Sequence, residues 1–504
     1  MHFRWYSRAL GLLLAFMLMR AAVAAPVPSF ETEMDQRVPG LLAKYHVPGA
    51  AMALIRDGEV VWSRGYGIAD LSTGEPVTAE HIFAHGSNCK PVTAWGALRL
   101  VDEGKVELDA PVDRYLKRWH LPASGFNASK VTLRRLLSHT AGLGSDTLIL
   151  HPWRWQPTLE QFISGQVPFH PPLHVQWEPG TKQQYSNESF AVVQLLIEDV
   201  TGEPFEAYMQ RTVLQPLGMQ RSSFVWTPEN KARAVRPHGF RNEPLPYYNV
   251  IVQGAGSLVG PVSDFARFLA ASMPGPGGLP SGRGVLRPET VALSMSPQPT
   301  TDGQGGLDYG LASLPDGRKL IQHAGGYAGW FARFAAVPET RMGLVVVVNS
   351  PQGEEFYLAI ERAWLRTELG VVLSGPAEPP APPLVDPIRQ GLLGLAAALM
   401  LGAVLMLVRI LALVRRGRRE WSPSGRRLLF SSPFILAVLV WLGWFYGPLP
   451  LPPLLLEDCP RELLALTMAL VLWATFGALM TFSHERELQG RRPFAASDGG
   501  PEGV

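Results

Sequence analysis

Three long apolar runs near the C-terminus restrict the architecture of this chain more than any other feature of its sequence. They cover residues 391–414, 428–446 and 463–482. A run of about 20 apolar residues is long enough to cross a bilayer, and three such runs are not expected as buried helices of a soluble domain. The slightly positive mean hydropathy of the whole chain, +0.07, agrees with this interpretation. We therefore expect three transmembrane helices within residues 391–482.

Basic residues predict how these helices are oriented. Arginines follow the first run and precede the second, and more arginines lie in the tail, residues 483–504. Because short cytoplasmic loops carry an excess of Lys and Arg, we expect residues 415–427 and the tail to be cytoplasmic. Residues 376–390 are rich in proline and predict a semi-rigid linker between the membrane and the preceding part of the chain.

Residues 1–24 have the three parts of a secretory signal peptide. Arg4 and Arg8 supply positive charge, an apolar run follows, and Ala22-Val23-Ala24 fits the small-x-small rule for cleavage. Arg20 is unusual in the cleavage region, and an uncleaved segment would act as an additional anchor. The signal peptide and the orientation of the helices both predict a bacterial inner-membrane protein whose N-terminal domain lies in the periplasm.

Residues 25–375 have the sequence pattern of one globular domain. Apolar runs on either side of Asp57-Gly58 predict a β-hairpin, and the runs 331–337 and 342–348 predict another. Residues 353–369 then have the pattern of an amphipathic helix. Strands at both ends of the domain, with helical patterns between them, predict an α+β fold with one antiparallel sheet covered by helices.

Charge and cysteine content bound the possible partners. The formal net charge of +2, without a basic stripe, argues against nucleic acid. The two cysteines, Cys89 and Cys459, fall in different predicted domains, so we expect no disulfide between them. No zinc-ligand spacing occurs, and we predict neither a metal nor a cofactor. The sequence identifies no protein partner.

A serine and a lysine at helical spacing are the first candidates for catalysis. Phe83-Ala84-His85-Gly86 leads into Ser87, and Lys90 follows in the first turn of a predicted helix. Side chains at positions i and i+3 share a helix face, so both groups point the same way. A buried lysine can take the proton of a serine hydroxyl, because desolvation disfavours its charged form. Cys89 is expected to be a small buried residue rather than a nucleophile.

Two further stretches contain groups that could complete such a site. Tyr185 and Asn187 precede an apolar helical pattern; a tyrosine can move a proton, and an asparagine can bind both a lysine and a substrate amide. His323 is followed by Gly325 and Gly326, and glycines allow a ligand to approach a backbone whose N–H groups could bind an oxyanion. Taken alone, the first stretch is better explained as a capped helix start, and the second could be a glycine-rich loop.

Considered together, these stretches resemble a known enzyme family. Three motifs occur in the order used by serine β-lactamases and penicillin-binding proteins: Ser87-x-x-Lys90, Tyr185-x-Asn187 and His323-x-Gly325. The resemblance is strongest to the class C-like branch, which includes D-alanyl-D-alanine carboxypeptidases, D-aminopeptidases and esterases, and it covers residues 30–370. It implies the β-lactamase/penicillin-binding fold, an antiparallel sheet with flanking helices and a helical subdomain. The phrase Ser138-His139-Thr140-Ala141-Gly142 is also similar to the family, and we expect its histidine to be a loop residue rather than a catalytic one.

The resemblance implies a role for each motif residue. Ser87 would attack a carbonyl and form an acyl-enzyme that water then hydrolyses. Lys90 and Tyr185 would share the proton transfers, and the sequence leaves open which of them is the first base. The backbone N–H groups of Ser87 and Gly326 would hold the oxyanion. The implied substrate-binding residues are Asn187, His323, Gly325 and Gly326.

One departure from the family bears on the substrate. Many β-lactamases and transpeptidases have a lysine at the position of His323, where it helps to bind a substrate carboxylate. A histidine is mostly neutral near pH 7 and binds anions less strongly. The departure therefore favours amide or ester substrates without a free carboxylate at that point.

The order of the domains resembles membrane-bound, precolibactin-type peptidases, which mature or inactivate nonribosomal peptides. We therefore expect a membrane-anchored, D-selective peptidase or amidase that cleaves N-acyl-D-amino-acid peptides beside the lipid bilayer. A carboxylesterase, a cell-wall D-peptidase and a weak β-lactamase remain alternatives with the same chemistry. A non-catalytic peptide receptor is disfavoured, because a receptor need not keep the serine, lysine and tyrosine together.

Overall fold

The computed structural model describes residues 28–144, 150–151, 157–167, 170–376 and 378, and single residues between 394 and 415. The predicted signal peptide, most of the predicted linker, the second and third apolar runs and the tail lie outside these described residues. None of the helices in the described part of the chain is both long and apolar enough to cross a bilayer. The transmembrane helices therefore stay a prediction.

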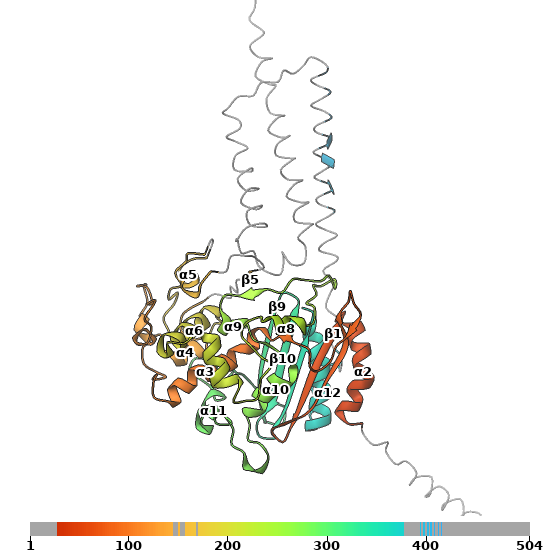
Figure 1. The fold of residues 1–504 in the computed structure, drawn as a ribbon, viewed down its shortest axis with the longest axis horizontal. Coiled ribbons are helices and arrows are strands. Elements are labelled where there is room, and N and C mark those ends of the chain that lie inside the picture. Colours follow the sequence, from red (N-terminus) through yellow and green to blue (C-terminus); the bar gives the residue numbers. More distant parts are fainter. Residues whose placement is uncertain are drawn as a thin grey trace, which may run out of the picture.

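A seven-stranded antiparallel sheet forms the centre of the structure, in the order β3-β2-β1-β11-β10-β9-β8 (Figure 1). Two short pairs, β4 with β7 and β5 with β6, lie outside it. The strands are β1 (Gly49–Arg56), β2 (Glu59–Asp70), β3 (Glu75–Pro76), β4 (Phe83–Ala84), β5 (Leu150–His151), β6 (Asn249–Val250), β7 (Val259–Gly260), β8 (Gly310–Ser313), β9 (Lys319–Tyr327), β10 (Trp330–Val337) and β11 (Met342–Val348).

Turn chemistry explains the hairpin at the start of the domain. Asp57 and Gly58 join β1 to β2, and their φ angles are 55° and 71°. Two central residues with positive φ match the right-handed twist of the strands, and Asp-Gly is a favoured pair for such a turn. β1 then pairs with β11 from Ala50–Val348 to Ile55–Gly343, so both ends of the domain meet in the middle of the sheet.

Helices cover both faces of the sheet. On one face, α2 and α12 lie together, while the larger group of helices lies on the other face (Figure 1). The helices are α2 (Phe30–Lys44), α3 (Cys89–Asp102), α4 (Leu133–Leu137), α5 (Leu159–Ile163), α6 (Asn187–Thr201), α7 (Phe205–Met209), α8 (Pro228–Ala232), α9 (Gln253–Gly256), α10 (Val262–Ala271), α11 (Pro288–Ser294) and α12 (Gly353–Leu369). A π-helical turn (Gln210–Leu214) follows α7, and short 3-10 turns lie at Gly86–Asn88, Val112–Arg114, Ala128–Lys130 and Pro276–Gly278.

Successive residues of the central strands point into two different cores. In β1, Ala51, Ala53 and Ile55 belong to the core beneath the larger group of helices. The intervening residues, Ala50, Met52 and Leu54, belong to the core with α2 and α12. Because side chains alternate along a strand, a strand covered on both faces is apolar at successive positions, as β1 is from Gly49 to Ile55.

Helix α3 is buried almost all round. Eleven of its fourteen residues are buried. Trp95 packs edge-to-face on Phe268 of α10, with ring centroids 5.0 Å apart. A helix that is enclosed in this way gives its first turn a fixed position, and Ser87 and Lys90 lie at that end.

The antiparallel sheet with helical cover is confirmed, as are both predicted hairpins and the helix over residues 353–369. One local difference concerns residues 322–327. The sequence suggested a glycine-rich stretch before the strand at 331, whereas these residues belong to a strand of their own, β9. The glycines do not prevent pairing, because β10 and β8 lie on either side of β9.

Candidate active site

Ser87 lies in the 3-10 turn Gly86–Asn88, which leads directly into α3. Strand β4 brings the chain to this turn and is held by the pairing of Phe83 with Gly260. Gly86 has a φ of 53°, which glycine adopts without the steric penalty of a side chain. The serine therefore stands at the N-terminal end of a rigid helix, where the helix dipole favours negative charge.

The hydroxyl of Ser87 accepts hydrogen bonds from two side chains. Lys90 Nζ donates to Ser87 Oγ at 2.9 Å, and Tyr185 Oη donates to the same oxygen at 2.7 Å. Lys90 is fully buried, and its Nζ also donates to the carbonyl of Ala255 at 2.6 Å. The structure therefore brings together the three residues for which the sequence predicts catalysis.

Tyr185 is held in its protonated form. Burial raises the pKa of its phenol, and the nearby charge of Lys90 opposes this only in part. At neutral pH the phenol consequently keeps its proton and acts as a hydrogen-bond donor to Ser87. The ring also lies 4.8 Å from Lys90 Nζ, where an aromatic face stabilises a cation.

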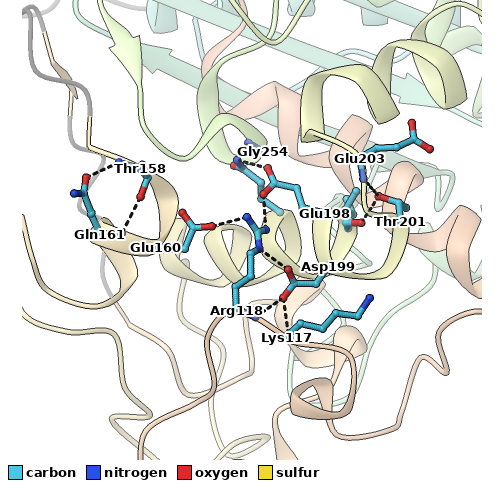
Figure 2. Close-up of polar contacts among 12 residues, drawn as sticks. Lys117, Arg118, Thr158, Glu160, Gln161, Glu198, Asp199, Thr201, Glu203 and Gly254 are labelled. Atoms are coloured by element: carbon cyan, nitrogen blue, oxygen red, sulfur yellow. Dashed lines mark hydrogen bonds and ion pairs between the residues drawn. The ribbon is translucent and has the colours of Figure 1, made fainter.

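A network of polar contacts fixes the carbonyl that holds Lys90. Ala255 belongs to α9, and the preceding amide of Gly254 donates to Gln194 Oε1 on α6 at 3.1 Å. Farther along α6, Glu198 and Asp199 accept hydrogen bonds from Arg118 at 2.6 Å and 2.5 Å (Figure 2). Arg118 also donates to Glu160 of α5. These contacts tie α6 to its neighbours and so support the position of α9.

The glycines of β9 allow the strand to pass directly behind the serine. A Cβ atom on Gly325 would lie 2.6 Å from the amide nitrogen of Ser87, and one on Gly86 would lie 2.5 Å from the amide nitrogen of Gly326. Real Cβ atoms do not approach so closely, so neither position tolerates a side chain without a shift of the backbone. The backbone that carries the amide of Ser87 thus lies directly beside the backbone that carries the amide of Gly326. The predicted oxyanion pair requires these two amides to be close together.

Asn187 and Cys89 also lie in this region. Asn187 is the first residue of α6, two positions after Tyr185, and is buried. Cys89 is a free, buried cysteine, and burial raises the pKa of its thiol to about 12. A thiol with such a pKa stays protonated at neutral pH, and the expectation that Cys89 is a small buried residue is confirmed. Cys459 lies outside the described residues.

His323 forms a cluster beside the catalytic groups with His139, which was expected only as a loop residue, and with Asp308, which the sequence analysis did not single out. His139 Nε2 donates to Asp308 Oδ1 at 2.9 Å, and the other oxygen, Oδ2, lies 3.7 Å from His323 Nε2. The ring of His139 packs against Tyr185, with centroids 4.6 Å apart. His139 lies in the turn after α4, as expected of a loop residue, but its ring also contacts a candidate catalytic side chain, which the sequence did not indicate.

Burial controls the charge of this cluster. It raises the pKa of Asp308 to about 7, against the lowering effects of His323 and Lys90. It lowers the pKa of His323 to about 4, so this histidine is neutral at pH 7. Among the described residues, no group of three or more His, Cys, Asp or Glu side chains could hold a metal ion.

Comparison with known proteins agrees with this geometry. Penicillin-binding protein 4 of Amycolatopsis lactamdurans is 26% identical over 374 residues, which are 71% of this chain and 95% of the relative. Esterase EstB of Burkholderia gladioli is 31% identical over 288 residues, 53% of this chain and 67% of the relative. D-aminopeptidase of Gluconobacter oxydans is 25% identical over 331 residues, 64% of this chain and 59% of the relative.

Solved structures with the same fold are also found. The octameric penicillin-binding protein homologue from Pyrococcus abyssi superposes with a TM-score of 0.55 at 23% identity, covering 72% of this chain and 81% of that chain. Residues 34–368 match the family described as Beta-lactamase. This match covers most of the described residues and includes the serine, the lysine, the tyrosine and the His323 strand. The chain therefore belongs to the Beta-lactamase family and is a serine hydrolase of the kind that includes penicillin-binding proteins, esterases and D-aminopeptidases.

Proposed function

We propose that this hydrolase forms an acyl-enzyme on Ser87 and cleaves the amide bond of N-acyl-D-amino-acid peptides at the outer face of a bacterial inner membrane. The observation that carries the catalytic part is the position of Ser87 Oγ, which lies 2.9 Å from Lys90 Nζ and 2.7 Å from Tyr185 Oη. A serine needs an adjacent base to become a nucleophile, and these two side chains already lie within hydrogen-bond distance of Ser87.

The proposed reaction uses these groups in two stages. Ser87 Oγ bonds to the substrate carbonyl carbon while Lys90, in its neutral form, accepts the hydroxyl proton. Tyr185 then donates its proton to the leaving amine as the carbon–nitrogen bond breaks, and the ammonium of Lys90 restores the phenol. The amides of Ser87 and Gly326 would stabilise the oxyanion. In the second stage a water molecule attacks the ester and releases the acid, with the proton path reversed.

The substrate part of the proposal rests on His323, which the family resemblance implies to be a substrate-binding residue. Its Nδ1 donates to the carbonyl of Ala324 at 2.7 Å, and burial keeps the ring neutral. A neutral ring offers no positive charge to a substrate carboxylate, which β-lactams and D-alanyl-D-alanine peptides carry. The site is therefore better suited to an amide whose carboxyl side is blocked or extended.

Membrane anchoring has two supporting observations. Among the few residues described in the first apolar run, Leu401, Val404, Leu405 and Val408 are each more than half exposed. They recur at helical spacing, and such an apolar helix face is unfavourable in water but favourable in a bilayer. At the start of the linker, Glu378 accepts hydrogen bonds from Arg37 at 3.0 Å and Lys44 at 2.9 Å on α2. The chain would therefore leave the domain from a fixed point rather than from a loose tail.

A carboxylesterase is the second candidate. The 31% identity with Esterase EstB favours it, because the same serine, lysine and tyrosine chemistry can cleave an ester. An ester needs less assistance to its leaving group than an amide. The two functions therefore differ in which substrate is turned over faster, not in the residues used.

The test compares membranes that carry the full-length chain with membranes that carry Ser87→Ala. Matched N-acyl-D-asparaginyl and N-acyl-L-asparaginyl peptides and a simple ester are incubated with both, and cleavage is followed by mass spectrometry. The proposal predicts cleavage of the D-peptide in preference to the L-peptide, and none by the variant. Equal cleavage of the two peptides would remove the D-selectivity, and turnover of the ester alone would establish the esterase instead.

A further inference from the structure

Asp308 is a fully buried carboxyl group next to the catalytic residues, and the reaction above does not use it. Its side chain has no exposed surface. Oδ1 accepts a hydrogen bond from His139 at 2.9 Å. Oδ2 is buried without a hydrogen-bond partner among the described residues, and His323 Nε2 lies 3.7 Å from it. A buried oxygen without a partner is costly, so its presence beside an active site requires an explanation.

Backbone groups fix the tautomers of both histidines. The amide of Ser186 donates to His139 Nδ1 at 3.2 Å, so that nitrogen carries a lone pair and the ring proton is on Nε2. His323 Nδ1 faces the carbonyl of Ala324 at 2.7 Å, so that nitrogen carries the proton and Nε2 carries the lone pair. Asp308 therefore meets an N–H on one side and a lone pair on the other.

We propose that Asp308 is a positioning residue that works as a neutral carboxylic acid: Oδ1 accepts a hydrogen bond from His139 Nε2, and Oδ2 carries a proton directed toward His323 Nε2. In this form the carboxyl group complements both rings. It keeps His139 packed against Tyr185 and keeps the ring of His323 uncharged. This proposal deepens the proposed function and rests on it, because the groups that Asp308 positions are those of the hydrolytic site.

The backbone at both ends of this contact is strained. His139 has a φ of 58° and Asp308 a φ of 66°. Non-glycine residues adopt such angles at an energetic cost, and they keep them where the surrounding structure requires it, often at functional sites. The contact between His139 and Asp308 accordingly joins two separate backbone segments that each adopt an unfavourable conformation to make it.

The charge of Asp308 also affects the base. Six titratable side chains face or neighbour its carboxyl group: His139, His323, Lys90, Tyr185, Cys89 and Tyr309. An ionised Asp308 would stabilise the ammonium form of Lys90 and so prevent it from accepting the serine proton. It would also place a negative charge against the lone pair of His323. The neutral acid avoids both effects, and its proton is lost as the pH rises past about 7.

The test compares Asp308→Asn with Asp308→Ala in the full-length chain in detergent, using hydrolysis of p-nitrophenyl acetate from pH 6 to 8.5. Asparagine matches the shape and the donor–acceptor pattern of the protonated acid, whereas alanine leaves both histidines without their partner. At pH 6 we expect kcat/KM of D308N within about threefold of the wild type, and a loss of about 100-fold or more in D308A. Between pH 6 and 8.5 the ratio of D308N to wild type should rise at least about tenfold.

A control and a second readout separate this inference from the proposed function. Asp264 is equally buried but binds Arg267 outside the site, so D264N should keep the wild-type pH profile. The infrared difference between pH 6 and 8.5 should contain the carbonyl band of a protonated carboxylic acid in the wild type and not in D308N, whether or not any substrate is cleaved. Hydrolysis by Ser87→Ala at the rate of the wild type would count against the proposed function. Any of four results would overturn the inference about Asp308. These are equal losses in D308N and D308A, an unchanged pH profile in D308N, a D308N chain that does not fold, and an infrared band that persists in D308N.

Discussion

Replacing Asp308 by asparagine should stabilise the domain, and the gain should grow with pH. In the folded chain burial raises the pKa of Asp308 from 3.8 to about 7. The folded state therefore binds more protons than the unfolded state between these values, and stability falls as the pH rises through them. One pKa unit corresponds to about 1.4 kcal/mol, so the ionisation of Asp308 destabilises the wild type by about 4 kcal/mol above pH 7.

His323 contributes with the opposite sign and must be included. Burial lowers its pKa from 6.5 to about 4, so the folded state binds fewer protons in that range and stability rises with pH there. In the wild type the two contributions nearly cancel between pH 4 and 6.5, because the pair holds one proton in both states. In Asp308→Asn only the contribution of His323 remains. The stability of the variant relative to the wild type should then increase by about 4 kcal/mol between pH 4 and pH 7.

Pulse proteolysis in urea measures this difference on the full-length chain in detergent, at pH 5, 6, 7 and 8. Asp264→Asn is the matched control, because Asp264 is as buried as Asp308 but is paired with Arg267 at 2.5 Å. This control should destabilise the domain at every pH and show no gain as the pH rises. A difference between D308N and the wild type that stays constant from pH 5 to pH 8 would refute the reasoning, because it would mean that Asp308 does not change its protonation in this range.

Three further substitutions test other contacts. Gly325→Ala would place a Cβ atom 2.3 Å from the carbonyl oxygen of His85 and 2.6 Å from the amide nitrogen of Ser87. Steady-state kinetics should therefore show at least about a 100-fold loss of kcat. Activity near that of the wild type would contradict the close approach of β9. Gly40→Ala, in the exposed middle of α2 with no atom near the added methyl group, should raise stability by about 0.5–1 kcal/mol in urea unfolding and leave kinetics unchanged. Tyr185→Phe removes the 2.7 Å hydrogen bond to Ser87 and should lower kcat by about 100- to 10,000-fold, while the midpoint of thermal unfolding changes little. A kcat within about threefold of the wild type would mean that the phenol moves no proton.

The sequence was sufficient for the parts of the fold that depend on local chemistry. Asp57-Gly58 defines its hairpin through the positive φ of both residues, and the amphipathic pattern over 353–369 gives α12 its limits. For residues 322–327 the sequence left two interpretations open, glycines that allow close approach to the backbone and a glycine-rich loop. The structure places these residues in strand β9, and the glycines, which lack side chains, allow β9 to lie against the serine turn. That β9 meets this particular turn is a tertiary contact without a local signal.

The same distinction holds for the site. Ser87 lies in the 3-10 turn that leads into α3, and Lys90 lies three positions later in the first turn of α3, so their contact follows from local helical geometry. Tyr185 required the spacing of a second motif and the resemblance to a family. Asp308 and His139 were not predicted as a pair, because they are 169 positions apart and both adopt positive φ angles that the sequence pattern does not indicate. A buried aspartate with no cation partner is also hard to anticipate, since an aspartate in sequence is expected at the surface.

The most direct test of the account is the mass of the enzyme during turnover. The full-length chain is mixed with an N-acyl-D-asparaginyl peptide or with p-nitrophenyl acetate, quenched in acid within the first turnover and digested for mass spectrometry. The account predicts that the peptide containing Ser87 gains the mass of the acyl group, and that Ser87→Ala gains none while its fold is unchanged. The account would be contradicted if Ser87→Ala hydrolysed the substrate as fast as the wild type, or if the acyl group were found on a different residue.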